Sequence, residues 1–322
     1  MKRFIPSLLS AALACASLES MAAADLIITN AKVFTGEPGQ ALQQAVAVED
    51  GKILQVGSNA AINALADAKT QRIDLAGKVL MPGMIDTHSH PIMGAMASMG
   101  ANLYDEVKPL AELEQWIIEQ DNAGHARHAD VILIDGASSA YWEQSAEIGK
   151  IFNQGRWADQ PVVLNGIDGH TGWANNAMLK RVKIDAALVK SLPEKEQNYF
   201  GHAADFTPNG YLAENAWDRV RSQLPAPSHE FMLDATREAV KLNNQVGVTA
   251  WMDAAANAGI GDSVFELIPT DKTTGVLPLY RKLAENGELS AHVAALMIAH
   301  PKSKPADLAV IDKVMQQFKG VP

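Results

Sequence analysis

The chain has 322 residues, of which 48% are hydrophobic and 20% charged, so it is long enough to bury a large core and has the composition of a globular protein. Its formal net charge is −10, and no block of lysine and arginine stands out. The sequence therefore lacks the basic surface that a protein needs to bind nucleic acid or an anionic membrane, and neither is an expected partner.

The first residues have the features of an export signal. Lys2 and Arg3 precede an apolar stretch over residues 4–16, and a run of three alanines ends at Ala24. The apolar stretch is too short to anchor the chain in a bilayer, and a buried N-terminal helix is the alternative. We therefore predict a signal peptide over residues 1–24, cut near Ala24, and a periplasmic or secreted product that has no membrane association after cleavage.

The single cysteine, Cys15, lies inside this leader. Attachment of a lipid there would require a better recognition sequence than Ala12-Leu13-Ala14. After cleavage the chain has no thiol for a disulfide, for nucleophilic catalysis or for binding zinc through sulfur. This suits an oxidising compartment such as the periplasm.

Residues 25–80 contain short alternating apolar runs separated by turn residues. The pattern predicts strands over 26–34 and 71–80 and a hairpin over 45–56. Asp50-Gly51 supplies the positive φ that the tight turn of this hairpin needs. The segment is therefore predicted to be a small β unit.

From residue 81 onward, strand-like runs alternate with helical patterns, which is typical of a parallel sheet with helical crossovers. About five strands are predicted, within 80–90, 131–134, 161–164, 248–251 and 291–299. Helices are predicted from residue 110 to about Gly124, from a cap at Ser228 to about Gly247, and over 278–286. The segment after residue 200 reads as loop.

The first of these strands carries the most informative pattern of the chain. Its apolar run leads to His88 and His90, with Asp86 before them and Pro91 after them. Side chains two apart on a strand point to the same side, so one divalent cation can bridge the two imidazoles. The pattern predicts a metal site at the end of this strand. The alternative is a pair of ordinary surface or core histidines.

Polar residues also follow the third and fourth predicted strands. Asp168, His170 and Asn175 come after the third strand and are candidates for binding substrate or orienting water, although a hydrogen-bonded turn would use the same residue types. Asp253 ends the fourth strand, where a barrel displays active-site groups, and is a fourth substrate-binding candidate. The alternative for Asp253 is a cap on the next helix.

These residues carry a resemblance to a known family. The segment Pro82–His90 resembles the first metal-binding strand of the amidohydrolase superfamily. Three later stretches are similar, in the expected order, to its amidohydrolase-3 or YtcJ-like branch: Asp168–Leu179, Gly210–Ala216 and Gly247–Ala254. The resemblance runs from about Asp25 to the last residue. It implies a metal-dependent hydrolase on a (β/α)8 barrel, with a small β-sandwich built from both chain ends.

The resemblance also implies roles for single residues. His88 and His90 are expected to bind a divalent metal, with zinc as the first candidate and one or two ions in the site. Glu214 stands in the Gly-x-Leu-x-Glu stretch, where relatives use a carboxylated lysine to bridge two metals, so it is a candidate ligand. The alternative is a solvent-facing glutamate at a helix start. The family's proton acceptor would lie beyond Pro322, so no catalytic residue is assigned in this chain.

The predicted fold is α/β, a partial (β/α)8 TIM-type barrel over residues 81–322, preceded by a sandwich portion over 25–80. A closed barrel has eight strands, and about five are predicted here. We therefore expect this chain to be the first part of a longer protein. By itself it is expected to be inactive.

The predicted function is that of an exported hydrolase that acts on carbon–nitrogen bonds of small, non-peptide, amide-type substrates through metal-activated water. Two alternatives stay open: an inactive truncated or binding protein on the same scaffold, and a metal-dependent esterase or isomerase. No phosphate-binding loop and no serine nucleophile elbow is present. Nucleic acid is not an expected partner, and homo-oligomerisation stays open.

Overall fold

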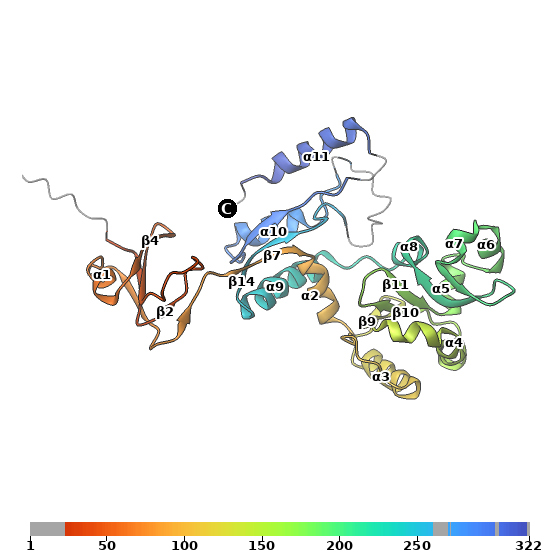
Figure 1. The fold of residues 1–322 in the computed structure, drawn as a ribbon. Coiled ribbons are helices and arrows are strands. Elements are labelled where there is room, and N and C mark those ends of the chain that lie inside the picture. The colour runs from red at the N-terminus through yellow and green to blue at the C-terminus, as the bar shows by residue number, and fades with distance from the viewer. Residues whose placement is uncertain (1–22, 260–269, 271, 300–302, 321–322) are drawn as a thin grey trace, which may run out of the picture. The chain divides into compact units, whose positions relative to one another are not determined.

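The computed structural model describes residues 23–259, 270, 272–299 and 303–320 (Figure 1). Residues 1–22 of the predicted leader lie outside this range. The chain divides into two compact units, with the boundary between Gly83 and Met84. In the part of the chain that the structure describes, no helix is long and apolar enough to cross a membrane.

The first unit consists of short strands and one helix. Its elements are β1 (Leu26–Thr29), β2 (Lys32–Val33), β3 (Ala45–Glu49), β4 (Lys52–Gly57), α1 (Asn59–Asn63), β5 (Gln71–Asp74) and β6 (Val79–Leu80). One sheet has the strand order β4-β3-β1-β5, and β2 pairs with β6 in another. The predicted hairpin is confirmed, because β3 and β4 are antiparallel and Asp50 and Gly51 at their turn have φ of 48° and 70°.

Two small apolar clusters hold this unit together. Ala45 and Ala47 of β3 contribute to one cluster with Ile27 and Ile62. Val46, between the two alanines, belongs to the other cluster. Successive side chains of a strand point to opposite faces, so β3 supplies both clusters.

The second unit contains a three-stranded parallel sheet with the order β15-β14-β7. Its strands and the helices around it are β7 (Met84–Ser89), α2 (Pro91–Met99), α9 (His229–Gln245), β14 (Val248–Asp253), α10 (Leu277–Glu285), β15 (His292–Ala295) and α11 (Pro305–Phe318). Apolar residues of these four helices form one buried cluster with Trp251 of β14. The cluster fixes β14, the central strand, against the helices.

Helix α9 follows the sequence-based prediction closely. Ser228 caps it, and its hydroxyl accepts a hydrogen bond of 3.1 Å from the backbone N–H of Phe231. Its buried residues are offset by 0, 3, 4, 7 and 8 positions, the spacing of one helix face: Met232, Ala235, Thr236, Ala239 and Val240. Gly247, with φ of 80°, follows the helix and leads into β14.

A six-stranded mixed sheet lies in the chain between β7 and β14, with the order β12-β13-β11-β10-β9-β8. The strands are β8 (Arg127–His128), β9 (Val131–Ala137), β10 (Val162–Gly166), β11 (Thr171–Ala174), β12 (Phe200–His202) and β13 (Pro208–Ala213). The α-helices of this region are α3 (Leu110–Asn122), α4 (Ser145–Phe152), α5 (Asn176–Arg181), α6 (Ala186–Ser191), α7 (Glu194–Gln197) and α8 (Glu214–Arg221), and short 3-10 helices span Ser139–Gln144 and Gly155–Trp157. Only β9 and β10 of this sheet are parallel neighbours.

The α/β prediction is confirmed, but the prediction that five strands form one parallel sheet is wrong. The strands predicted at 131–134 and 161–164 are β9 and β10 of the six-stranded sheet, whereas β7, β14 and β15 form their own sheet. A parallel strand that is buried on both faces shows the same apolar run in either sheet, so sequence pattern does not reveal its partner. The region after residue 200 is also not only loop, because it forms β12 and β13.

Candidate metal and substrate site

His88 and His90 lie at the carboxyl end of β7, just before α2 begins at Pro91. Both histidines are exposed, and their ring centroids are 5.7 Å apart with an interplanar angle of 87°. Pro91 occupies the first turn of α2, and its fixed φ favours starting a helix there. The backbone N–H of His88 donates a 3.0 Å hydrogen bond to Oδ1 of Asp86, which fixes the strand end.

The separation of the two rings fits shared binding of one metal ion. A zinc–nitrogen bond of about 2.0–2.1 Å places a ring centroid roughly 3 Å from the ion, so a tetrahedral angle at the ion puts two centroids about 5 Å apart. The observed 5.7 Å is close to this separation, and a small rotation of one ring would close the difference. Zinc sites in enzymes have three protein ligands, and among the described residues no group of three or more His, Cys, Asp or Glu side chains is arranged to bind a metal. The pair therefore supplies two suitable donors of an incomplete set.

Asp253 lies beside the two histidines, at the end of the neighbouring strand β14. It pairs in register with Ser89, the residue between His88 and His90. Asp253 is only 4% exposed, and its Oδ2 accepts a hydrogen bond of 2.6 Å from the hydroxyl of Tyr280. Burial raises the pKa of Asp253, while the Tyr280 hydroxyl and a charged His90 act in the opposite direction. This is a positioned, buried carboxyl group and not an open contact surface.

Glu214 and His170 meet in the six-stranded sheet. They flank β13 and β11, which are antiparallel neighbours, and Nδ1 of His170 is 3.3 Å from Oε2 of Glu214. The backbone N–H of Glu214 also donates a hydrogen bond of 2.8 Å to the carbonyl of His170. Glu214 has a φ of 48°, a left-handed conformation that costs energy in residues other than glycine. Glu214 thus contacts His170. Among the described residues, no cluster of possible metal ligands contains Glu214 together with His88 and His90.

Asp168 organises the turn between β10 and β11. Its Oδ1 accepts hydrogen bonds of 2.9 Å from the backbone N–H groups of His170 and Thr171. The Thr171 hydroxyl is 2.8 Å from the other carboxylate oxygen, and Trp142 donates to that hydroxyl at 2.9 Å. Burial, together with the negative charges of Asp168 and Glu214, raises the pKa of Tyr211, so these groups share one electrostatic environment.

Asn175 has a structural role, which corrects its prediction as a substrate-binding residue. It is fully buried and caps α5 by accepting the N–H of Met178 at 3.1 Å. Its Oδ1 also accepts the N–H of Val162 at 3.0 Å, and its Nδ2 donates to three backbone carbonyls, those of Phe152, Trp157 and Gln160. These contacts use the whole amide, so none of it is available to a substrate.

Sequence reasoning missed two polar features of these sheets. Tyr280, on the apolar stripe of α10, reaches Asp253, but nothing in the sequence links two residues so far apart. At the carboxyl ends of β9 and β10, Asn165 donates a hydrogen bond of 2.7 Å to Oδ1 of Asp135. Burial raises the pKa of Asp135, opposed by the Asn165 hydrogen bond and by the charge of His128. A lone Asp within an apolar run was the available sequence signal for this pair.

Comparisons with known proteins agree on one family. The sequence profile of the Amidohydrolase family matches residues 71–300. The exoenzymes regulatory protein AepA of Pectobacterium carotovorum subsp. carotovorum is 25% identical over 241 residues, which cover 73% of this chain and 50% of that protein. The N-substituted formamide deformylase of Arthrobacter pascens is 34% identical over 230 residues, covering 65% of this chain and 40% of that enzyme. The chain therefore spans half or less of the length of these relatives.

A solved structure shows a similar fold. It is that of an uncharacterized metal-dependent hydrolase from Pyrococcus horikoshii, with a TM-score of 0.55 and 19% sequence identity. The match covers 84% of this chain and 48% of that protein.

Proposed function

The chain belongs to the amidohydrolase family, and we propose that it is part of a metal-dependent hydrolase that cleaves carbon–nitrogen bonds in small, non-peptide, amide-type molecules. The observation that carries this proposal is the pair of exposed imidazoles, 5.7 Å apart, at the end of β7. The relative from Arthrobacter pascens, named for deformylation of N-substituted formamides, supports the choice of bond.

His88 and His90 would hold the ion, with zinc as the first candidate. The bound ion would supply a Lewis acid that polarises a carbonyl group and activates water. Both side chains are exposed, so a substrate carbonyl has access to the position between the rings. Asp253 is buried at the end of the neighbouring strand, so it is not placed to contact the substrate.

The His170–Glu214 pair is proposed to contact the substrate, with Asp168 shaping its loop. This replaces the predicted role of Glu214 as a metal ligand. Two observations support the assignment: the His170 and Glu214 side chains are 58% and 40% exposed, and Glu214 is held at a φ of 48°. Strained backbone of this kind tends to cluster at functional sites.

The proposed architecture assigns β7, β14 and β15 to the first three strands of a (β/α)8 barrel. They are parallel, they follow one another in chain order, and helices α9, α10 and α11 precede or follow them. The six-stranded sheet is then an insertion after the first barrel strand. The first unit would be part of a β-sandwich. Further metal ligands and the proton acceptor are proposed to lie outside this sequence, which spans half or less of its relatives' length.

A second candidate function is an inactive or purely binding protein on the same scaffold. It is favoured by the observation that, among the described residues, no third His, Cys, Asp or Glu side chain joins His88 and His90 to complete a metal site. Export through the leader over residues 1–24, into the periplasm or medium, is a further proposal that rests on the sequence.

The test is metal binding by the purified chain, followed by hydrolysis assays. Zinc would be titrated against a chromophoric chelator, and N-formyl amines, other amides and esters would then be assayed. His88→Ala and His90→Ala should each abolish zinc binding. His292→Ala is the matched control, because His292 is an exposed histidine on β15 of the same sheet. Zinc binding that survives both histidine variants would contradict the proposal.

A further inference from the structure

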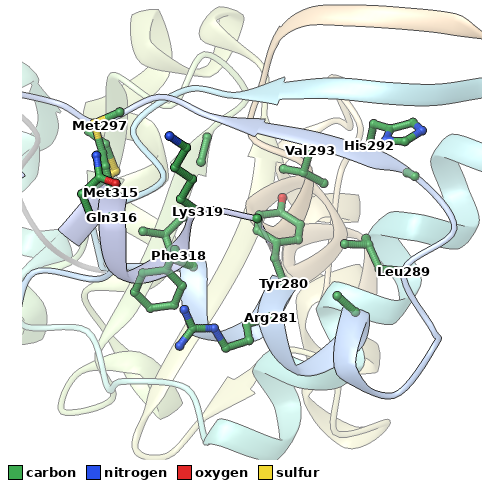
Figure 2. Close-up of a pocket in the computed structure, with 15 residues that line it drawn as sticks. Tyr280, Arg281, Leu289, His292, Val293, Met297, Met315, Gln316, Phe318 and Lys319 are labelled. Atoms are coloured by element: carbon green, nitrogen blue, oxygen red, sulfur yellow. The ribbon is translucent and has the colours of Figure 1, made fainter. Parts of the chain in front are cut away.

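A groove of about 500 Å³ lies between α10, β15 and α11 (Figure 2). It exists because α11 buries only Ile311 and Val314 among its 14 residues. Most of this helix therefore stays at the surface, and a gap remains between its last turns, α10 and β15. Pockets that bind small molecules have volumes of about 300–1,000 Å³. The groove is therefore large enough to take up one small molecule.

The walls of the groove are largely apolar. Val293 and Ala295 lie two apart on β15, so their side chains share one face of the strand, and both line the groove. Figure 2 shows Met297 and Met315 at one end of the groove and Leu289 at the other. Methionine side chains adapt to irregular shapes, so this end can follow the outline of a bound molecule. Such walls suit the hydrocarbon body of a ligand.

The ionisable groups that line the groove are basic. Arg281, Lys319 and His292 line it, and no Asp or Glu is among the described residues that do so. Within the described part of the chain, neither Arg281 nor Lys319 forms an ion pair with a carboxylate. The chain as a whole has a net charge of −10, so this lining is a local exception. Its charge is complementary to an anion.

Arg281 is oriented by contacts that leave its charge intact. Its guanidinium carbon lies 4.0 Å from the ring centroid of Phe318, within the range of a cation–π interaction, as Figure 2 shows. Its Nη2 donates a hydrogen bond to the backbone carbonyl of Gln317. A guanidinium has five N–H donors, and among the described residues this is the one hydrogen bond of the Arg281 side chain. The remaining donors can bind a carboxylate through two parallel hydrogen bonds.

We propose that this groove binds a small carboxylic acid with an unbranched apolar body, as in the anion of a medium-chain fatty acid. The hydrocarbon body lies along the apolar wall that β15 provides, and the carboxylate pairs with Arg281 and Lys319. A neutral molecule of the same length leaves the two cations without a partner, and an amine is repelled by them. This binding site is additional to the proposed hydrolase activity and does not depend on a metal at His88 and His90.

The experiment is calorimetric titration of the full chain with octanoate, hexanoate, octanamide and octylamine, each below its micelle concentration. We expect one equivalent of octanoate to bind. Burial of one methylene group changes affinity by about fourfold, so hexanoate should bind about 15-fold more weakly than octanoate. Octanamide, which has the same length and no charge, should bind about tenfold or more weakly, and octylamine should not bind.

Three variants of the full chain test the two cations. Arg281→Gln should weaken octanoate binding about tenfold, because it removes a charged hydrogen-bond donor. Lys319→Gln should weaken it about two- to fivefold, as for an exposed ion pair. Lys282→Gln is the matched control, because Lys282 is the exposed next residue of α10 and is not among the residues that line the groove. Thermal unfolding checks that each variant folds, and Lys319→Gln decides the outcome if Arg281→Gln does not.

Three results would overturn this inference. Absence of octanoate binding by the wild-type chain would show that the groove has no such ligand. Equal affinities for octanoate and octanamide would show that the groove does not recognise charge. Octanoate binding that is unchanged in the folded Arg281→Gln and Lys319→Gln variants would place the ligand elsewhere. None of these results bears on zinc binding by His88 and His90, so the proposed function is tested separately.

Discussion

Asp253 of β14 pairs in register with Ser89 of β7, the residue that separates His88 from His90. The pairing puts a buried carboxyl group next to the strand end that carries both candidate metal ligands. It also shows that β14 is the direct neighbour of β7, although the whole six-stranded sheet lies between them in the chain.

The backbone of Glu214 predicts an unusual order of stabilities. At ordinary helical positions alanine is more stable than glycine by about 1 kcal/mol. Glu214 begins α8 with a φ of 48°, where a Cβ atom costs about 1–2 kcal/mol. We therefore expect Glu214→Gly to have a higher free energy of unfolding than Glu214→Ala, measured by urea titration. A more stable alanine variant would show that the left-handed conformation is not maintained.

Glu214 also distinguishes the two roles considered for it. Because its carboxylate lies 3.3 Å from His170, we expect Glu214→Ala to leave the zinc affinity of this chain unchanged. The loss of His88 should abolish binding in the same assay. A tenfold or larger loss of zinc affinity in Glu214→Ala would restore Glu214 as a metal ligand.

Substitution of Asn175 is expected to lower the free energy of unfolding strongly and to leave metal binding unchanged. Asn175→Ala leaves buried backbone groups near α5 without partners, and we expect the free energy of unfolding to fall by about 3 kcal/mol. The matched control is Asn176→Ala, the exposed next residue, expected to change it by less than about 0.5 kcal/mol. Chemical denaturation checks both values. Equal effects of the two substitutions would refute the structural role.

Asp135 predicts a pH dependence of stability. Burial raises its folded-state pKa above the usual 3.8, so the protonated form is favoured in the folded protein. The protonated Asp135 side chain therefore makes its full contribution to the free energy of unfolding below pH 3.8. This contribution is lost as the pH rises through the pKa of Asp135 in the folded protein. Asp135→Asn, which can still accept the Asn165 hydrogen bond, should therefore gain stability relative to wild type as the pH rises over this range. Denaturation at several pH values tests this, and a constant difference would contradict it.

Local features of the fold could be predicted from the sequence because they depend on neighbouring residues. Asp50-Gly51 determines its hairpin, and Ser228 determines where α9 begins. In the same way, the apolar runs of β9 and β10 identify them as strands, since burial on both faces leaves a local pattern.

Pairing between distant segments could not be predicted in this way. The run at Val131 looks like a strand next to β7 but belongs to another sheet. For the candidate site, the spacing of His88 and His90 was visible, whereas the contact between Tyr280 and Asp253 depends on how α10 packs on β14. The role of Asn175 was misjudged because an asparagine at a strand end looks the same whether it faces a substrate or the core.

The central claim is that His88 and His90 bind one metal ion, and zinc titration of the purified chain tests it most directly. We predict one equivalent of bound zinc in the wild-type chain and in His292→Ala, and none in His88→Ala or His90→Ala under the same conditions. Equal zinc binding by all four proteins, or none by the wild type, would contradict the claim.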